Sequence, residues 1–288
     1  NKIELEEGIL DLHQVQISHF ATEKIIERMP INSSEFSDHL HNFNEVSIEV
    51  KYPSSTFRTI YNQLLSMKRL DNQRIKVRIF ISGISETDME FRNDKNVNSI
   101  ILDKSVSVIK GGQMGSFRGC SSLTEIKIPN SVTSIGAGSF RECISLESIE
   151  LPSSLIHVGE GAFRFCSSLL HVSIPSSVTT FEDHIFKGCS SLREITIPPS
   201  INSIGDGFFR DCSSLVNVSI PSSVTSIGNS AFRDCSSLAQ LTLPSSITSI
   251  GICAFRGCSS LVNIALPASI TSIGKGAFRE CSALTQIT

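Results

Sequence analysis

The sequence predicts an α/β solenoid, in which short turns of chain stack on one another and pair their strands into a parallel sheet. Three observations predict it: a 23-residue internal repeat, apolar positions that divide each repeat into short extended pieces, and a proline and a glycine at fixed places between those pieces. The 288 residues are 40% hydrophobic and 18% charged, which indicates a folded chain rather than a disordered one.

The repeat is marked by three columns of residues. Phenylalanine recurs every 23 residues, cysteine follows three positions later, and leucine follows three positions later again. The phenylalanines are Phe117, Phe140, Phe163, Phe186, Phe209, Phe232, Phe255 and Phe278, and the cysteines are Cys120, Cys143, Cys166, Cys189, Cys212, Cys235, Cys258 and Cys281. Seven full repeats and a partial eighth therefore occupy residues 123–288.

Each repeat is expected to contain two extended pieces and one helical turn. Apolar and polar residues alternate over 215–220 as in a strand, and Pro221 ends this strand because it has no N–H to donate. Residues 224–227 form the second extended piece, and Gly228 permits a tight turn. Residues 231–235 place an alanine, a phenylalanine and a cysteine on one side of a short helical or 3₁₀ turn.

A single repeat of this length cannot bury its own apolar side, but stacked repeats can. Strands that pair in parallel lie roughly 4.8 Å apart, so each apolar column becomes a continuous ladder through the stack. The expected result is a right-handed, curved solenoid with a parallel sheet along one side.

The repeat unit Leu-x-x-Ile-x-Ile-Pro-x-Ser-Val-Thr-Ser-Ile-Gly-x-x-Ala-Phe-x-x-Cys-x-x-Leu resembles the BspA-like class of leucine-rich repeat over residues 123–288. The resemblance implies a curved leucine-rich repeat arc with the parallel sheet on its concave side and short helical or 3₁₀ turns on its outer side. It also implies a non-enzymatic role in binding other macromolecules. Members of the class are often surface adhesins of bacteria and protozoan parasites, with extracellular-matrix proteins among their ligands.

The amino-terminal third departs from the 23-residue period. Residues 97–122 are interpreted as a degenerate first repeat with a longer glycine-rich connection, and 1–96 as an amino-terminal α/β cap region. Strands expected at 46–50 and 75–81, 29 residues apart, flank a helix expected at 57–64. These strands either continue the solenoid sheet or form a separate small α/β domain. Two short helices, at 20–26 and 36–43, would cover the first rung.

The cysteine column has two interpretations. Disulfides between rungs are one, but side chains in register stand farther apart than the ~3.8 Å Cβ separation that a disulfide prefers. Cysteine also packs as a small buried apolar group, and no Cys-x-x-Cys or histidine-rich set accompanies the column to bind zinc. Reduced, buried thiols are therefore favoured, with Cys253, which lies off the column, expected to be the accessible one.

A second column places a cation directly after each phenylalanine: Arg118, Arg141, Arg164, Lys187, Arg210, Arg233, Arg256 and Arg279. Acidic residues follow four of these cations directly, at Glu142, Asp211, Asp234 and Glu280. This favours a solvated outer edge with mutually compensated charges. The alternative is a linear site for an anionic polymer such as a sulfated glycan or polyphosphate.

The outward-facing side of the expected sheet is the candidate partner-binding surface. Its charged side chains gather in the early repeats, at Glu125, Lys127, Glu150, His171 and Glu194, whereas later repeats carry small neutral residues there. The chain has no tryptophan, and neither of its two tyrosines lies in the repeats, so the usual aromatic anchors of a tight interface are missing. We expect a protein partner for this face.

Other functions lack support in the sequence. No catalytic motif, cofactor motif or metal-binding pattern is present beyond an isolated His39/His41 pair. The net charge of −3 argues against nucleic acid, and no apolar run is long enough for membrane insertion. An end-to-end homodimer through the carboxyl-terminal edge is one further expectation. Reduced cysteines and the absence of a signal peptide favour the cytoplasm, whereas the resemblance favours a cell surface.

Overall fold

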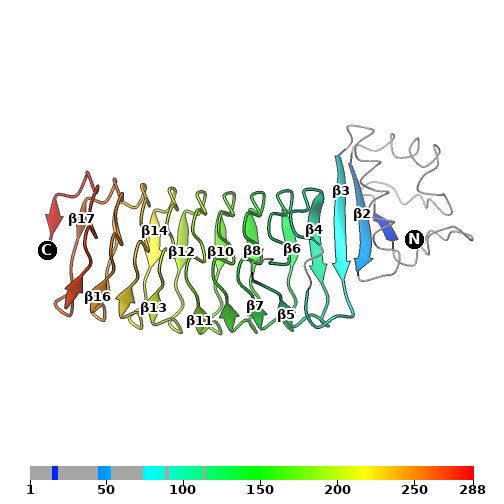
Figure 1. The fold of residues 1–288 in the computed structure, drawn as a ribbon, viewed down its shortest axis with the longest axis horizontal. Helices are drawn as coiled ribbons and strands as arrows, with labels where there is room; N and C mark the ends of the chain where they lie inside the picture. Colours follow the sequence, from blue (N-terminus) through cyan, green and yellow to red (C-terminus); the bar gives the residue numbers. More distant parts are fainter. Residues whose placement is uncertain (1–14, 19–44, 53–73, 88–90, 113–114) are drawn as a thin grey trace, which may run out of the picture.

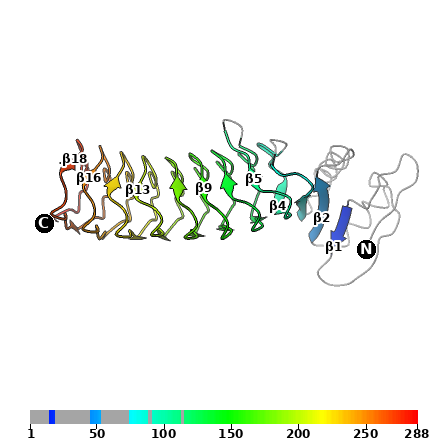
Figure 2. The same ribbon diagram turned by 90° about the horizontal axis from the view of Figure 1, so that it is seen from below.

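The chain forms an elongated stack of rungs that follow one another in sequence order (Figure 1). The computed structural model describes residues 15–18, 45–52, 74–87, 91–112 and 115–288. The amino-terminal strands lie at one end of the stack and the carboxyl terminus at the other, and a perpendicular view shows the same elongated shape (Figure 2). Within the described residues, no helix is long and apolar enough to cross a bilayer.

The amino-terminal strands belong to the same sheet as the first repeats. Strand β2 (Glu45–Tyr52) pairs in parallel with β3 (Arg74–Ile81), which pairs in parallel with β4 (Val97–Leu102), and β4 pairs with β6 (Glu125–Lys127). Strand β1 (Val15–Ser18) adds to β2 in the antiparallel direction. The strands expected at 46–50 and 75–81 therefore extend the solenoid sheet. The helices expected at 20–26, 36–43 and 57–64, and the His39/His41 pair, lie outside the described residues.

Two rows of short parallel strands run along the repeats. The first row continues from β6 through β8 (Ser148–Glu150), β10 (His171–Ser173), β12 (Glu194–Thr196), β14 (Asn217–Ser219), β17 (Asn263–Ile264) and β19 (Gln286–Ile287). The second row contains β5 (Val108–Ile109), β7 (Ser134–Ile135), β9 (His157–Val158), β11 (Thr180–Phe181), β13 (Ser203–Ile204), β15 (Ser226–Ile227), β16 (Ser249–Ile250) and β18 (Ser272–Ile273). Paired residues in the regular repeats are 23 positions apart, as the sequence predicts.

The helical or 3₁₀ turns expected on the outer side are not confirmed, because the described residues contain no helix of either kind. From Phe140 to Phe278, each column phenylalanine instead lies between two residues with left-handed backbone, as Gly138 (φ 61°) and Glu142 (φ 64°) show around Phe140. Left-handed residues cannot continue a right-handed helix. The Cys143 N–H bonds to the Phe140 carbonyl in the same rung (3.1 Å), whereas the Glu142 N–H bonds to the Arg164 carbonyl in the next rung (2.8 Å). The repeat region is therefore a β-solenoid.

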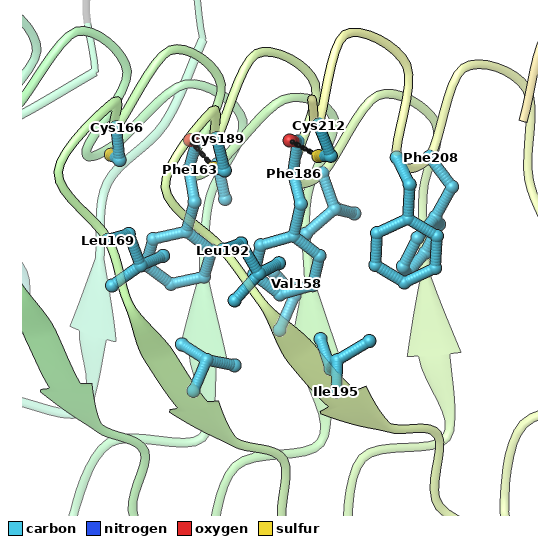
Figure 3. Close-up of a cluster of buried hydrophobic side chains, with 14 of the residues drawn as sticks. Val158, Phe163, Cys166, Leu169, Phe186, Cys189, Leu192, Ile195, Phe208 and Cys212 are labelled. Carbon is cyan, nitrogen blue, oxygen red and sulfur yellow. Dashed lines mark hydrogen bonds between the residues drawn. The ribbon is translucent and has the colours of Figure 1, made fainter. Parts of the chain in front are cut away.

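The phenylalanine column forms the spine of the core. The ring centroids of consecutive column members lie 5.3–6.1 Å apart, from Phe91 to Phe278. Leucines, valines and isoleucines of both strand rows surround the rings (Figure 3). Phe91 was not expected in this column. It precedes Phe117 by 26 residues and is followed by Asp94 where other repeats have cysteine, so the stack includes a rung before residue 97.

All eight column cysteines are free thiols, and seven of them are buried. Each thiol hydrogen-bonds to a phenylalanine carbonyl of the preceding rung, as Cys189 does to Phe163 at 3.2 Å and Cys212 to Phe186 at 3.1 Å (Figure 3). The Phe163 carbonyl also accepts the N–H of Cys166 (3.1 Å). A carbonyl oxygen has two lone pairs, so this arrangement uses both of them. The prediction that the column consists of reduced, buried cysteines is confirmed. The hydrogen bond that each thiol makes to the preceding rung was not predicted.

Thiol labelling tests the burial of the column. Among the nine cysteines only Cys253 and Cys281 are partly exposed, Cys281 because it lies in the last rung. We expect iodoacetamide to label these two in the folded chain and all nine after unfolding in urea, as read by peptide mass spectrometry. Labelling of Cys166 in the folded chain as fast as Cys253 would contradict a buried column.

The repeated glycine before each phenylalanine turn serves close approach between rungs. A Cβ atom at Gly251 would lie 2.5 Å from the carbonyl carbon of Gly228, and one at Gly274 would lie 2.3 Å from the Ile252 nitrogen. The glycine is therefore required by the neighbouring backbone rather than by the tight turn that we expected. Glu182 replaces this glycine in one rung, and the second strand row is interrupted there, between β11 and β13.

Candidate functional site

The first strand row presents one set of side chains to solvent. In β6, β8, β10 and β12 the central residue is buried and its two neighbours are exposed. We call the outward side chains of this row the strand face. Because the central residues are Ile126, Ile149, Val172 and Ile195, all packed in the core, each strand holds its two outward residues in a fixed position.

All five predicted partner-binding residues are exposed on the strand face. The Lys127 Nζ lies 3.8 Å from the Glu125 Oε1, and the His171 Nδ1 lies 4.0 Å from the Glu194 Oε1. Glu150 stands between these two pairs, on β8. Lys127 and the carboxylates therefore place both signs of charge on the face, and each pair is largely open to water, which makes its contribution to stability small.

A shallow, open hollow of about 640 Å³ lies over β10, β12 and β14. His171 and Glu194 line it, together with Thr196, Asn217 and Pro199. The last three residues were not among the predicted site residues. The sequence does carry a signal for one of them, because Pro198-Pro199 is the only pair of consecutive prolines in the repeats.

The rung beneath this hollow departs most from the repeat. Phe181 stands where neighbouring repeats have isoleucine or valine, and it packs edge-on against Phe208 with ring centroids 5.3 Å apart. His184 takes the left-handed conformation (φ 62°) that glycine has in the two adjacent rungs. The irregular residues are thus concentrated around β10–β13, whereas the later repeats are nearly uniform.

The cation column lies along the phenylalanine turns and is mostly compensated. Six of its eight members lie within 4.0 Å of a carboxylate: Arg118, Arg141, Arg210, Arg233, Arg256 and Arg279. Arg118 and Arg256 are each followed by glycine, and their partners come from the next rung, Glu142 at 3.8 Å and Glu280 at 3.0 Å. Arg92 follows Phe91 in the same way and extends the column by one residue.

The described residues offer no arrangement for catalysis or metal binding that we can identify. They contain no group of three or more histidine, cysteine, aspartate or glutamate side chains that could hold a metal ion. The column thiols are held protonated, since burial raises the pKa of Cys166 to about 12. The exposed charged and polar side chains can bind a ligand through ion pairs and hydrogen bonds.

The parallel strand rows, the 23-residue rungs and the buried leucine column together define a leucine-rich repeat protein. The family model "BspA type Leucine rich repeat region" matches six copies over residues 85–216 and 202–288. The chain therefore belongs to the BspA-type leucine-rich repeat family, as its repeat unit predicts.

One solved structure has a similar fold, and two others match with lower scores. A leucine-rich repeat protein from Bacteroides ovatus has a TM-score of 0.70 at 23% identity, over 97% of this chain and 70% of that one. A leucine rich cell surface protein from Faecalibacterium prausnitzii has a TM-score of 0.48 at 26% identity, over 74% of this chain and 63% of that one. A leucine-rich repeat protein from T. pallidum has a TM-score of 0.47 at 24% identity, over 76% and 84% of the two chains. The comparison with curated proteins finds no match.

Proposed function

We propose that this chain is a non-catalytic binding module that recognises a protein partner through the strand face, centred on the hollow between His171 and Glu194. The observation that carries the proposal is the position of this hollow. It lies where the surface charges, the double proline and the irregular core coincide, in a scaffold whose other repeats are nearly uniform.

The composition of the hollow supports a polar, charged epitope as the ligand. His171 and Glu194 have 65% and 64% of their side-chain surface exposed, and the remaining polar lining comes from hydroxyl and amide groups. Such groups bind by hydrogen bonds and ion pairs, which give orientation and specificity. Pro199 and Ile174 add a small apolar wall.

The experiment compares two sets of alanine substitutions on the same face. One variant replaces the five early residues Glu125, Lys127, Glu150, His171 and Glu194, and the control variant replaces exposed late residues outside the hollow, Gln240, Thr242, Asn263, Gln286 and Thr288. Binding to a panel of extracellular-matrix proteins, the ligand class that the family resemblance implies, is measured by biolayer interferometry.

We expect the early variant to lose at least about tenfold in affinity for any matrix protein that the unchanged chain binds, and the late variant to lose less than about threefold. Both variants should unfold at nearly the same temperature as the unchanged chain, because all ten positions are exposed. Equal affinities of the early variant and the unchanged chain would refute the assignment of this face.

Two further partners were predicted from the sequence, an anionic polymer along the cation column and a second copy of the chain at the carboxyl-terminal edge. A continuous polyanion site along all eight cations is poorly supported, because six of them already contact a carboxylate. An end-to-end homodimer stays a prediction. Ile273 and Ile287, near the carboxyl-terminal edge, are 46% and 49% exposed.

A further inference from the structure

Two neighbouring cations in the middle of the column differ from the rest. Neither Arg164 nor Lys187 lies within 4.0 Å of a carboxylate among the described residues, unlike the other six predicted members of the column. The two stand in adjacent rungs, since the Phe165 N–H bonds to the Lys187 carbonyl at 2.7 Å.

The residue that follows Arg164 accounts for its lack of a carboxylate partner. Glycine after Lys187 does not by itself account for the same lack, since Arg118 and Arg256 are also followed by glycine and are paired. Arg233 donates its Nε–H to Asp234, the next residue, at 3.1 Å. Phe165 occupies the corresponding position after Arg164, and the Arg164 guanidinium lies over its ring at 4.9 Å. Gly188 occupies the position after Lys187, and the Phe165 ring fills the space beside it, within 2.2 Å of where a Cβ would stand.

The environment leaves these cations incompletely satisfied. The Arg164 Nε is buried and has no hydrogen-bond acceptor among the described residues. Desolvation and then the repulsion of Arg141 lower the pKa of Arg164, and desolvation and then the repulsion of Arg164 lower the pKa of Lys187. A bound anion would relieve this repulsion.

The acidic groups near the pair do not remove the excess positive charge. Glu142 and Glu160 favour the charged form of Arg164, and Asp211 favours that of Lys187. Of these, Glu142 already contacts Arg141 at 2.9 Å and Asp211 contacts Arg210 at 3.5 Å.

We propose that Arg164 and Lys187 form a discrete site for the sulfate or phosphate groups of an extended polyanion. The site lies on the phenylalanine turns and not on the strand face, so it does not rest on the proposed protein-binding function. Lys187 contributes an ammonium group, and Arg164 contributes a guanidinium that lies over the Phe165 ring. Arg141 and Arg210, on either side of the pair, already contact carboxylates, so only a short stretch of the polymer is expected to bind.

The test compares two double substitutions that lower the net charge equally. Arg164→Gln with Lys187→Gln removes the proposed site, and Arg233→Gln with Arg256→Gln removes two paired members of the same column. Affinity for a heparin-derived oligosaccharide and, separately, for an inorganic polyphosphate of similar length is measured at about 0.15 M ionic strength. The two probes distinguish a sulfate source from a phosphate source.

For at least one probe, the first double variant should bind about tenfold or more weakly, and the second less than about threefold more weakly. The slope of log K against log salt concentration should be about −2 for two cations, against about −7 for a track of eight cations. Equal losses in the two double variants would overturn the discrete site in favour of a continuous track. Binding of neither probe by the unchanged chain would overturn it altogether.

A third comparison reproduces at Arg164 the Arg-Asp sequence that the chain has at Arg233-Asp234. Phe165→Asp places a carboxylate after Arg164, at a backbone conformation (φ 61°) that matches Asp234 (φ 60°). It should reduce polyanion affinity as much as the first double variant, whereas Phe165→Asn, which removes the ring without adding charge, should reduce it less. Equal effects of Asp and Asn at this position would count against a charge-based site.

Discussion

Raising the pH from 8 to 10 is expected to lower the free energy of unfolding by several kcal/mol. Burial raises the pKa of the Cys166 thiol from an ordinary value of 9.0 to about 12, and burial raises the pKa of the Cys143, Cys189 and Cys235 thiols well above their ordinary value. Above pH 9 the unfolded chain releases protons that the folded chain retains, so stability falls as pH rises. Between pH 8 and pH 10 each buried thiol contributes about 1.4 kcal/mol, and the seven buried thiols of the column, whose pKa burial raises in every case, together reach on the order of 10 kcal/mol.

Urea unfolding at pH 8, 9 and 10 in reducing buffer measures this effect. Lysines and tyrosines also titrate in this range, so the control is a variant with Cys166 and Cys189 replaced by alanine. This variant keeps those other groups but should lose about 3 kcal/mol of the pH-dependent change. Identical pH dependence of variant and unchanged chain would show that the thiols are not the titrating groups.

Phe186→Ala is expected to lower the free energy of unfolding by about 3–5 kcal/mol, because it opens a cavity in the middle of the spine. The Phe186 ring is fully buried and stacks between Phe163 and Phe209, with centroids 5.6 and 5.9 Å away. Repeats of a solenoid contact only their neighbours, so the loss also weakens the coupling between the two halves of the stack. Urea unfolding should show a lower midpoint and a broader or divided transition.

Phe165→Ala is the matched control, in the rung next to Phe186. Phe165 is only partly buried and lies on the outer turn, beneath the Arg164 guanidinium, so its loss should cost about 1 kcal/mol or less. If the two substitutions destabilise the chain equally, the stacked column is not the main source of stability.

Most of the repeat architecture could be predicted from the sequence. The 23-residue spacing of Phe, Cys and Leu indicates a stack in register, because only stacking lets each repeat bury its apolar side. The outward residues of each strand followed from the alternation around Ile149 and Val172. The amino-terminal strands could not be assigned to the sheet in this way, because 29- and 26-residue spacings break the period.

The conformation of the outer turns could not be predicted from the sequence, because it depends on neighbouring rungs. An alanine and a phenylalanine before a cysteine suit a helical turn locally, yet Glu142 and its equivalents adopt left-handed backbone and bond to the next rung. The energy of those inter-rung hydrogen bonds outweighs the cost of left-handed backbone for a residue other than glycine.

The sequence alone determined the repeat length, the buried columns and the exposed strand face, since these follow from the linear spacing of apolar and polar residues. Only the tertiary structure decided which charges meet. Arg256, which glycine follows, reaches Glu280 in the next rung, 24 positions away. Lys187, which glycine also follows, has no carboxylate within 4.0 Å in the described part of the chain. The physical reason is that stacking places each side chain beside residues one repeat away, at distances that linear spacing does not specify.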